Sequence, residues 1–423
     1  MFNFRKTAFW LKDTLQGGDI KRQYKAIRDN IDKPINNESL DRLLKHATNN
    51  CSFYSEYKTS LDITTFPVIN KSTIKNYFDG FISSGYQLDQ LHVMSTSGST
   101  GTPFKSYQDK RKRNRVLAEL IYFNERAEQV LGNKFIFFRV WNENNSKSSL
   151  VRLIQNIVCI NILKFNDEVF KGAVSLLKND KKLTSCLGYA STYEYFVRYI
   201  VKEHADIKPA GLKSIVTSSE VMPVEIKRQI KEVLLCNVYD RYSNQENGIV
   251  AQTLDCTDTF IVNHPSYLVE ILKENSDEPA SEGEVGRIVI TDLFNYAMPY
   301  IRYDTGDLAV KVGSEQFSKS IQAVQGRQVD VIYDVEGNVL TPHTLSVYMW
   351  KFDKLAQYQF IQEEKKSYVL KVSGADGIYT KEDFRCVLVP VLGNDANIGV
   401  VYVNEIPVLS SGKFKKTICN YTP

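Results

Sequence analysis

A stretch rich in glycine and hydroxyl side chains, STSGSTGTPFK at 95–105, is the first candidate for chemistry in this sequence. Gly98 and Gly101 lack a Cβ, so the backbone N–H groups around them can approach an anion closely. The hydroxyl groups beside them are further donors, from Ser97, Ser99, Thr100 and Thr102. A helical pattern at 114–132 follows, and a flexible tether is a poor fit there. We therefore expect a loop that holds phosphate, and a plain polar loop is the alternative.

Four later stretches hold charged side chains of the types that act on nucleotides. Glu246 and Asp307 carry carboxylates, which only accept hydrogen bonds and offer the hard oxygen that Mg²⁺ prefers. Lys413 carries a compact ammonium on a flexible stem. Each has a plainer interpretation when taken alone: a glutamate at a helix start, an aspartate in a turn, and one lysine of a basic tail. The stretches are DRYSNQENG (240–248), IRYDTGD (301–307), GRQVDVI (326–332) and SSGKFKK (410–416).

Two further groups of residues give weaker indications of function. DKRKRNR (109–115) contains five basic residues, and we predict a solvated helix face there rather than a contact with polyphosphate or an acidic carrier. Cys256 and His264 are not accompanied by a second pair at metal-ligand spacing. Structural or substrate-side residues therefore fit them better than zinc ligands.

Composition excludes several classes of protein. The 423 residues are 43% hydrophobic and 24% charged, values typical of a globular protein large enough for two domains. A net charge of +4 is too small over this length to indicate a nucleic-acid partner. The seven cysteines show no C-x-x-C spacing, and a reducing cytoplasm fits them. Charges interrupt every apolar run of the N-terminal MFNFRKTAFWLKDTL, and no apolar stretch reaches membrane-span length.

The elements that must position these residues alternate along the chain, as in an α/β fold. STYEYFVRYIVKEH (191–204) predicts an amphipathic helix with Ser191 as N-cap and Glu194 completing a capping box. MPVEIKRQIKEVLL (222–235) predicts another helix, with Pro223 in its first turn. Strands are predicted at 134–141, 212–219 and 286–294.

Taken in order, STSGSTGTP and the four later stretches resemble the signature series of the adenylate-forming superfamily, whose members join a carboxylate to AMP. FPVINKSTI (66–74), VTSSEVM (216–222) and YSNQENGIVAQTLDC (242–256) look most like the phenylacetate-CoA ligase-like group, and within it the branch of capsule and surface-polysaccharide biosynthesis. The resemblance implies the α/β fold of adenylate-forming enzymes. It implies a large N-terminal domain of mixed sheets with helices (1–327), which binds ATP and the carboxylate. A small mobile C-terminal α/β domain (328–423) would carry the catalytic lysine.

The same resemblance implies residue roles. The Ser/Thr/Gly loop wraps the β- and γ-phosphates, Tyr242 packs on adenine and Asp240 lies near the base edge. Asp307 accepts hydrogen bonds from the ribose hydroxyls, and Arg327 adds charge near the α-phosphate. The implied ATP-binding set is Ser97, Gly98, Ser99, Thr100, Gly101, Thr102, Ser219, Glu220, Asp240, Tyr242, Asp307 and Arg327.

Catalysis is assigned by the resemblance to Lys413, which bridges the carboxylate and the α-phosphate, and to Glu246, which holds Mg²⁺. The sequence departs from the usual pattern at Gln245, where relatives have threonine, and at Val329, where they have an acidic residue near the domain pivot. Tyr189, Ala190 and Ser191 stand where relatives line the acyl pocket.

Three functions follow from this set. The first is adenylation of a small carboxylic acid with ATP and Mg²⁺, then acyl transfer to an amine or hydroxyl of a sugar precursor in surface-polysaccharide biosynthesis. The second passes the acyl group to coenzyme A or to a carrier protein thiol. The third is a nucleotide-binding protein without catalysis, against which the presence of Asp307, Glu246 and Lys413 argues.

Overall fold

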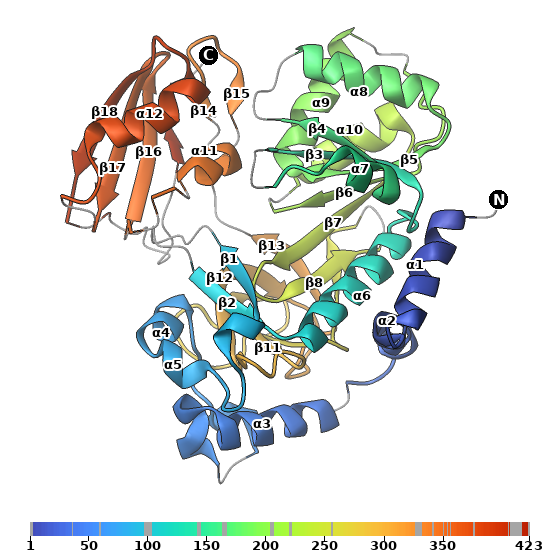
Figure 1. Cartoon of the computed structure of the whole chain (residues 1–423), viewed down its shortest axis with the longest axis vertical. Helices are drawn as coiled ribbons and strands as arrows, with labels where there is room; N and C mark the ends of the chain where they lie inside the picture. Colours follow the sequence, from blue (N-terminus) through green and yellow to red (C-terminus); the bar gives the residue numbers. More distant parts are fainter. Residues whose placement is uncertain are drawn as a thin grey trace.

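The structure is a computed structural model, and it contains α-helical, 3₁₀ and β elements in alternation (Figure 1). It describes residues 3–421 apart from 36, 59–60, 97–103, 142–144, 163–166, 204–206, 220–221, 255–256, 326–331, 341, 350, 353, 356, 375–376, 405 and 407–416. The helices are α1 (Phe4–Leu15), α2 (Asp19–Asn30), α3 (Glu38–Asn50), η1 (Ser52–Tyr57), η2 (Ile63–Thr65), α4 (Lys71–Asn76), α5 (Phe78–Phe81), η3 (Leu88–Gln90), α6 (Lys110–Arg126), α7 (Ser149–Gln155), α8 (Asp167–Asn179), α9 (Ala190–Glu203), α10 (Val224–Leu234), α11 (Pro342–Met349) and α12 (Lys381–Leu392).

The strands follow the same numbering by chain order. They are β1 (His92–Thr96), β2 (Phe104–Gln108), β3 (Lys134–Arg139), β4 (Ile157–Asn161), β5 (Leu183–Tyr189), β6 (Ser214–Ser218), β7 (Asn237–Asn244), β8 (Gly248–Thr253), β9 (Thr259–Val262), β10 (Tyr267–Leu272), β11 (Val285–Asp292), β12 (Tyr303–Lys311), β13 (Ser320–Gln325), β14 (Ile332–Tyr333), β15 (Val339–Leu340), β16 (Gln357–Glu364), β17 (Ser367–Ser373), β18 (Asn397–Tyr402) and β19 (Thr417–Cys419).

One eleven-stranded sheet organises most of the chain, in the order β10-β11-β12-β13-β9-β8-β7-β6-β5-β3-β4. The strands from β4 to β7 in this order are parallel, and those from β7 to β10 are antiparallel. In the parallel half the register pairs Ser218 with Arg241. Helices α7 to α10 make the connections between these parallel strands, as β-α-β units require.

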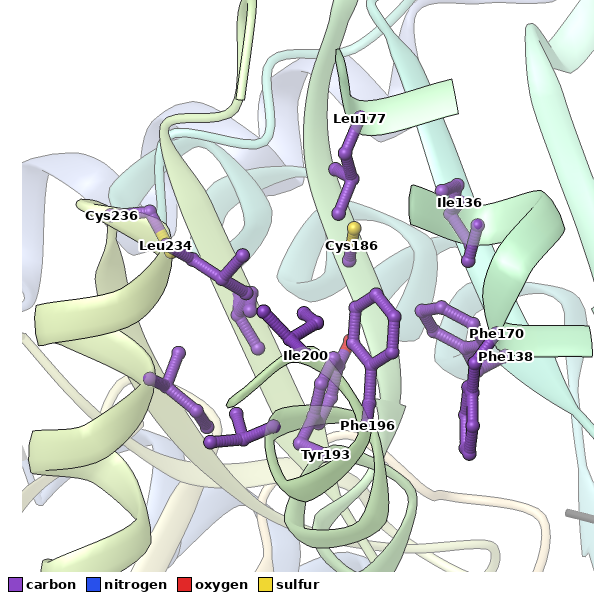
Figure 2. Packing of buried hydrophobic residues seen from close by; sticks show 14 of the residues in the cluster. Ile136, Phe138, Phe170, Leu177, Cys186, Tyr193, Phe196, Ile200, Leu234 and Cys236 are labelled. Carbon is purple, nitrogen blue, oxygen red and sulfur yellow. The ribbon is translucent and has the colours of Figure 1, made fainter. Parts of the chain in front are cut away.

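The core of the parallel half is apolar and rich in aromatic rings (Figure 2). The rings of Tyr193 and Phe196, on α9, pack against the Phe138 ring of β3, at 5.8 Å and 5.6 Å between ring centroids. Helix α9 begins at Ala190, so Ser191 lies inside its first turn rather than at the N-cap that we predicted. The helix itself forms where the spacing of apolar residues predicts it.

A second core joins the N-terminal helices to the antiparallel half of the sheet. Tyr54 of η1 is fully buried there, and its hydroxyl contacts the main-chain oxygen of Pro299 at 3.3 Å. Ile69 forms a bridge with Tyr303 at the start of β12. The segment before α4 is thereby fixed against β12, which matters for the site described below.

The C-terminal residues build a separate four-stranded sheet, in the order β18-β17-β16-β19. Helix α12 lies against it and begins with a capping box between Thr380 and Asp383. The sheet and its helices share an apolar cluster of their own. Tyr333 of β14 instead packs against the core of the parallel half. Figure 1 shows the C-terminal sheet beside the layer of α8, α9 and α10. The predicted α/β class, with a large sheet part and a smaller C-terminal part, is confirmed.

Candidate active site

The candidate site begins at the carboxyl edge of the parallel strands. β5 ends at Tyr189, β6 is followed by Ser219, and β7 runs into the turn that contains Glu246. Ligands of open α/β sheets bind outside this edge. Ser219 is exposed and has a φ of +71°, a left-handed conformation that residues other than glycine rarely adopt. Three of the predicted segments therefore meet at one edge of the sheet.

Glu246 is buried between two groups from distant parts of the chain. Its Oε1 accepts a 2.6 Å hydrogen bond from the Tyr303 hydroxyl and lies 3.0 Å from Lys71 Nζ. Burial raises the pKa of this carboxyl, but the Lys71 charge and the Tyr303 hydrogen bond outweigh burial, so the pKa lies below its ordinary value. Glu246 is therefore held as a carboxylate.

The second oxygen of Glu246 fits a cation site. Oε2 is buried and has no hydrogen-bond partner in the described part of the chain. A buried charged oxygen without a partner is costly, and a hard divalent cation satisfies it. The donor chemistry and the ionised state both fit the predicted Mg²⁺ ligand.

Tyr242 and Asp307 meet although their strands are not neighbours. Tyr242 projects from β7 and Asp307 from β12, and the order of the sheet places β8, β9 and β13 between them. The Tyr242 hydroxyl lies 3.0 Å from Asp307 Oδ2 and 3.1 Å from Thr305 Oγ1. The sheet must curl to bring these strands face to face, and the curl places the predicted adenine-packing and ribose-binding residues together.

Asp240 is buried and its carboxylate contacts protein groups. Oδ2 lies 2.6 Å from Lys227 Nζ of α10, and Oδ1 accepts a hydrogen bond from the Thr217 hydroxyl. Asp258 also contacts Lys227, at 2.9 Å. The two carboxylates raise the pKa of Lys227 despite its burial. These contacts fix β7 against β6 and α10, two residues before Tyr242.

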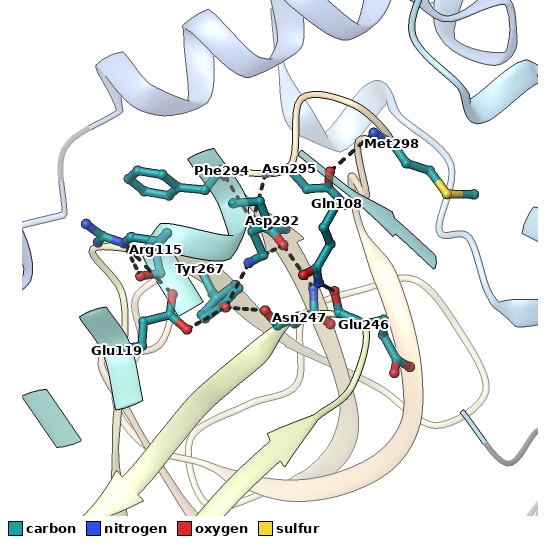
Figure 3. A network of polar contacts seen from close by, with 12 residues as sticks. Gln108, Arg115, Glu119, Glu246, Asn247, Tyr267, Asp292, Phe294, Asn295 and Met298 are labelled. Atoms are coloured by element: carbon teal, nitrogen blue, oxygen red, sulfur yellow. Dashed lines mark hydrogen bonds and ion pairs between the residues drawn. The ribbon is translucent and has the colours of Figure 1, made fainter. Parts of the chain in front are cut away.

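A buried polar network lies beneath the Glu246 turn (Figure 3). Lys112 Nζ lies 2.7 Å from Asp292 Oδ2 and donates a 2.9 Å hydrogen bond to the Tyr267 hydroxyl. That hydroxyl is 2.7 Å from the main-chain oxygen of Asn247 and 2.9 Å from Glu119 Oε2, so its single proton serves one of them at a time. The network thus reaches the backbone directly after Glu246.

Gln108 makes a second contact with the same turn. Its Nε2 donates a 2.9 Å hydrogen bond to the main-chain oxygen of Glu246. Gly248 has a φ of +130°, and a Cβ there would lie 2.8 Å from the Tyr267 hydroxyl oxygen. The close approach of the network to this backbone therefore requires glycine at 248.

The basic run at 109–115 corrects one prediction. We expected a solvated helix face, but Lys112 and Arg115 of α6 are completely buried in this network. Arg115 donates hydrogen bonds to the Ser266 hydroxyl and the Pro265 carbonyl oxygen, both at 2.8 Å, and lies over the Phe294 ring. Burial lowers its pKa to about 10. The charge pattern was misleading because buried carboxylates neutralise these two cations. Lys110 and Arg111, in the same run, are exposed as expected.

Several predicted residues lie outside the described residues, namely the loop Ser97 to Thr102, Glu220, Arg327, Val329, Cys256 and Lys413. The strands that flank the loop are described: β1 and β2 form an antiparallel pair in which Thr96 opposes Phe104. The expected phosphate loop therefore connects two strands of a hairpin directly before α6. Lys105 on β2 is exposed.

His264 does not resemble a metal ligand. It is buried, and its Nε2 lies 2.7 Å from the main-chain oxygen of Ile31. Within the described ranges, no group of three His, Cys, Asp or Glu side chains is arranged to hold a metal ion.

Sequence reasoning missed Lys71, Tyr303 and Gln108 as parts of the site. Lys71 belongs to the quoted stretch FPVINKSTI, and Tyr303 to IRYDTGD. The motifs that contain Lys71 and Tyr303 were therefore recognised in the sequence. Their contacts with Glu246 arise from tertiary packing, and no sequence pattern indicates them.

Comparison with known proteins finds similarity in sequence over parts of the chain. The family model of the CapK C-terminal domain matches residues 332–420. A phenylacetate-coenzyme A ligase of Pseudomonas putida is 25% identical over 161 residues, which span 37% of this chain and 36% of that ligase. The match thus covers about a third of the curated relative.

Solved structures show the fold. A 2-hydroxyisobutyryl-CoA ligase, crystallised with its adenylate and coenzyme A, aligns with a TM-score of 0.59 at 17% identity, over 90% of this chain and 88% of that one. The same ligase in an open conformation aligns with a TM-score of 0.55 at 16% identity, over 90% and 89% of the two chains. The chain has the fold of the adenylate-forming ligases. Its sequence is similar to that of a phenylacetate-coenzyme A ligase over 161 residues, and residues 332–420 match the CapK C-terminal domain.

Proposed function

We propose that this protein is an adenylate-forming ligase that activates a carboxylic acid with ATP. One observation carries the proposal: Tyr242 and Glu246 of the motif at 240–248 each contact the motif at 301–307, through Asp307 and Tyr303 respectively. Two motifs of one superfamily, more than fifty residues apart in the sequence, have little reason to make two such contacts by chance.

In the proposed first step, a carboxylate oxygen of the acid attacks the α-phosphorus of ATP. The bond to the β-phosphate oxygen breaks, and the products are an acyl-adenylate and pyrophosphate. Asp307 binds the ribose hydroxyls, and the Tyr242 hydroxyl orients that carboxylate from 3.0 Å. Glu246 would hold Mg²⁺, which neutralises phosphate charge when bound.

Lys71 is a further cation at this site. It lies beside the one Glu246 oxygen that Tyr303 also contacts, and its side chain is a quarter exposed. Lys71 keeps Glu246 ionised and holds Oε1 in place, so that Oε2 is directed to the cation. Lys413, carried by the proposed small domain (328–423), would stabilise the charge that moves to pyrophosphate. The proposed large domain (1–327) would bind ATP and the acid.

In the second step, an amine or hydroxyl of a sugar-bearing precursor attacks the acyl carbon, and AMP leaves. This acceptor rests on the surface-polysaccharide-like motifs of the sequence, and the match of residues 332–420 to the CapK C-terminal domain is consistent with it. The phenylacetate-coenzyme A ligase match supports transfer to the coenzyme A thiol as the second candidate.

The test is to incubate the protein with MgATP and a panel of carboxylic acids, and to add either amino-sugar nucleotides or coenzyme A. Pyrophosphate release that depends on the acid is expected in both series. Amide or ester products, identified by mass spectrometry, support the sugar acceptor. Thioester formation without amide or ester products identifies coenzyme A as the acceptor instead. If no acid causes pyrophosphate release, the proposed ligase function is contradicted.

A further inference from the structure

Helix α1 presents an apolar stripe on the side opposite to its packing face. Phe4, Ala8, Leu11 and Leu15 are all exposed, and their spacing of 4, 3 and 4 residues places them on one side of an α-helix. The exposed fractions of the three large side chains are 73%, 60% and 80% in chain order. Single exposed apolar residues are common, but a whole helical stripe is not.

The other side of α1 is fixed to the molecule. The Trp10 ring lies 5.6 Å from the Tyr24 ring of α2, and Lys6 Nζ lies 2.6 Å from Glu125 Oε1 of α6. Asp13 is buried and accepts hydrogen bonds from the backbone N–H groups of Ile20 and Lys21. Rotating the stripe inward would break all of these contacts, so the stripe faces outward.

Helix α7 adds a second exposed apolar face beside the first. Leu150, Leu153 and Ile154 lie on one side of α7 and are 65%, 65% and 62% exposed. Arg5 Nε of α1 donates a 3.3 Å hydrogen bond to the Leu153 carbonyl oxygen, so the two helices are neighbours. We call the two faces together, Phe4, Leu11, Leu15, Leu150, Leu153 and Ile154, the α1–α7 surface. Helix α1 lies on the opposite side of the molecule from the C-terminal sheet (Figure 1).

The charge around this surface is positive. Residues 3–16 and 145–155 contain five basic residues, Arg5, Lys6, Lys12, Lys147 and Arg152, and one acidic residue, Asp13. Asp13 is buried as a cap of α2, and Lys6 is paired with Glu125. Arg5 and Lys12 are exposed at the edges of the α1 stripe, and Arg152 is exposed on α7.

We propose that the α1–α7 surface docks on an anionic phospholipid membrane. Helices that lie in a membrane interface combine an exposed apolar face with lysine and arginine at its borders. A second copy of this chain fits less well, because a two-fold contact would bring two positive surfaces together. The described helices offer no membrane span, so the docking would be peripheral. This inference is independent of the proposed ligase function.

The test is co-sedimentation of the full chain with vesicles. We expect binding to vesicles of equal parts phosphatidylglycerol and phosphatidylcholine, and much weaker binding to phosphatidylcholine alone. Raising the salt from about 0.05 M to about 0.5 M shortens the Debye length to about 4 Å and should weaken the binding. Because each basic residue near an anionic surface contributes about fivefold, Lys12→Gln should lower the partition coefficient about fivefold.

The apolar part is tested by Leu11→Ser, Leu15→Ser and Leu153→Ser in one variant, which should lose vesicle binding. The matched controls are Val201→Ser with Val224→Ser, and Lys208→Gln with Lys231→Gln, which are exposed residues elsewhere that should keep wild-type binding. All variants should keep the wild-type Tm, since the altered side chains are exposed. A wild-type protein that does not co-sediment with anionic vesicles overturns the proposal. So does a dimer in sedimentation that only the triple serine variant dissociates.

Discussion

Lys112 Nζ and Asp292 Oδ2 lie 2.7 Å apart, and both side chains are completely inaccessible to solvent. This pair connects α6, which follows the expected phosphate loop, to the end of β11 in the antiparallel half of the sheet. Tyr267 extends the pair to the backbone of Asn247, next to Glu246. The turn that carries Glu246, the candidate cation ligand, is thus supported by a polar network in which buried cations are paired with buried carboxylates.

Replacing Lys112 with methionine should be strongly destabilising. Asp292 would remain as a buried carboxylate without its cation, a change that costs about 3–5 kcal/mol. Urea unfolding of Lys112→Met measures the loss. Lys110→Met, on the exposed side of the same helix, is the control and should stay within about 0.5 kcal/mol of wild type. Equal stability of the two variants would contradict the network.

Replacing Gln108 with leucine should affect the metal more than the acid substrate. The main-chain oxygen of Glu246 loses its 2.9 Å donor, so the turn that carries the carboxylate loses part of its fixation. We expect a higher Mg²⁺ concentration for half-maximal pyrophosphate exchange, with the KM for the acid nearly unchanged. Gln108→Glu keeps the side-chain length but removes the donor, and should behave similarly. An unchanged Mg²⁺ requirement in both variants would mean that the hydrogen bond is only structural.

Acid unfolding should depend on Lys71. The pKa of Glu246 lies below 4.5, so its ionised form contributes stability above about pH 4.5, and this contribution is lost as the pH falls through the lower folded value. In Lys71→Gln the charge that most lowers this pKa is gone and burial raises it, so the loss should begin at a higher pH. Tm measured from about pH 3 to pH 7 tests this. The exposed Lys105→Gln is the control, and coincident acid limbs of all three proteins would refute the assignment.

Replacing Asp307 with alanine should weaken nucleotide binding. A ribose bonded to one carboxylate loses a charge-assisted contact of about 1.5–3 kcal/mol, equivalent to about 10- to 150-fold in Kd. Tyr242→Phe keeps the ring but removes the hydroxyl that orients Asp307, so its effect should be smaller. Calorimetric titration with ATP measures both. Wild-type affinity in a folded Asp307→Ala protein would end the ribose assignment.

Replacing Lys413 with alanine should abolish catalysis but not ATP binding. This residue lies outside the described residues, and its role comes from the resemblance of SSGKFKK alone. A cation that acts on developing charge contributes about 10²–10³ in rate. Acid-dependent pyrophosphate exchange measures the loss, with Lys415→Ala as the control from the same stretch. If Lys415→Ala is the inactive variant, the catalytic role belongs to that lysine.

Local patterns in the sequence were sufficient for the α/β class and for the few helices and strands that were predicted. Helix α9 and helix α10 follow from apolar residues at helical spacing, and strands β3, β6 and β11 from apolar runs of strand length. The order of the motifs indicated the superfamily, because an ordered series is far rarer by chance than any one member. Glu246, Tyr242 and Asp307 were therefore identified before any contact between them was known.

Tertiary structure decided which charges are buried and which residues meet. In the sequence, Lys112 and Arg115 look like neighbours in a solvated run, and Lys110 carries the same charge. Whether such a cation faces water or an internal carboxylate depends on strands more than a hundred residues away in the sequence. The helical periodicity of 109–115 does not indicate which strands pack against the helix. The Lys71 and Tyr303 contacts to one oxygen of Glu246 arise in the same way, from the bridge between Ile69 and Tyr303. The sequence therefore determined which chemical groups the site contains, and only the fold decided their partners, because ionisation and orientation depend on packing between distant segments.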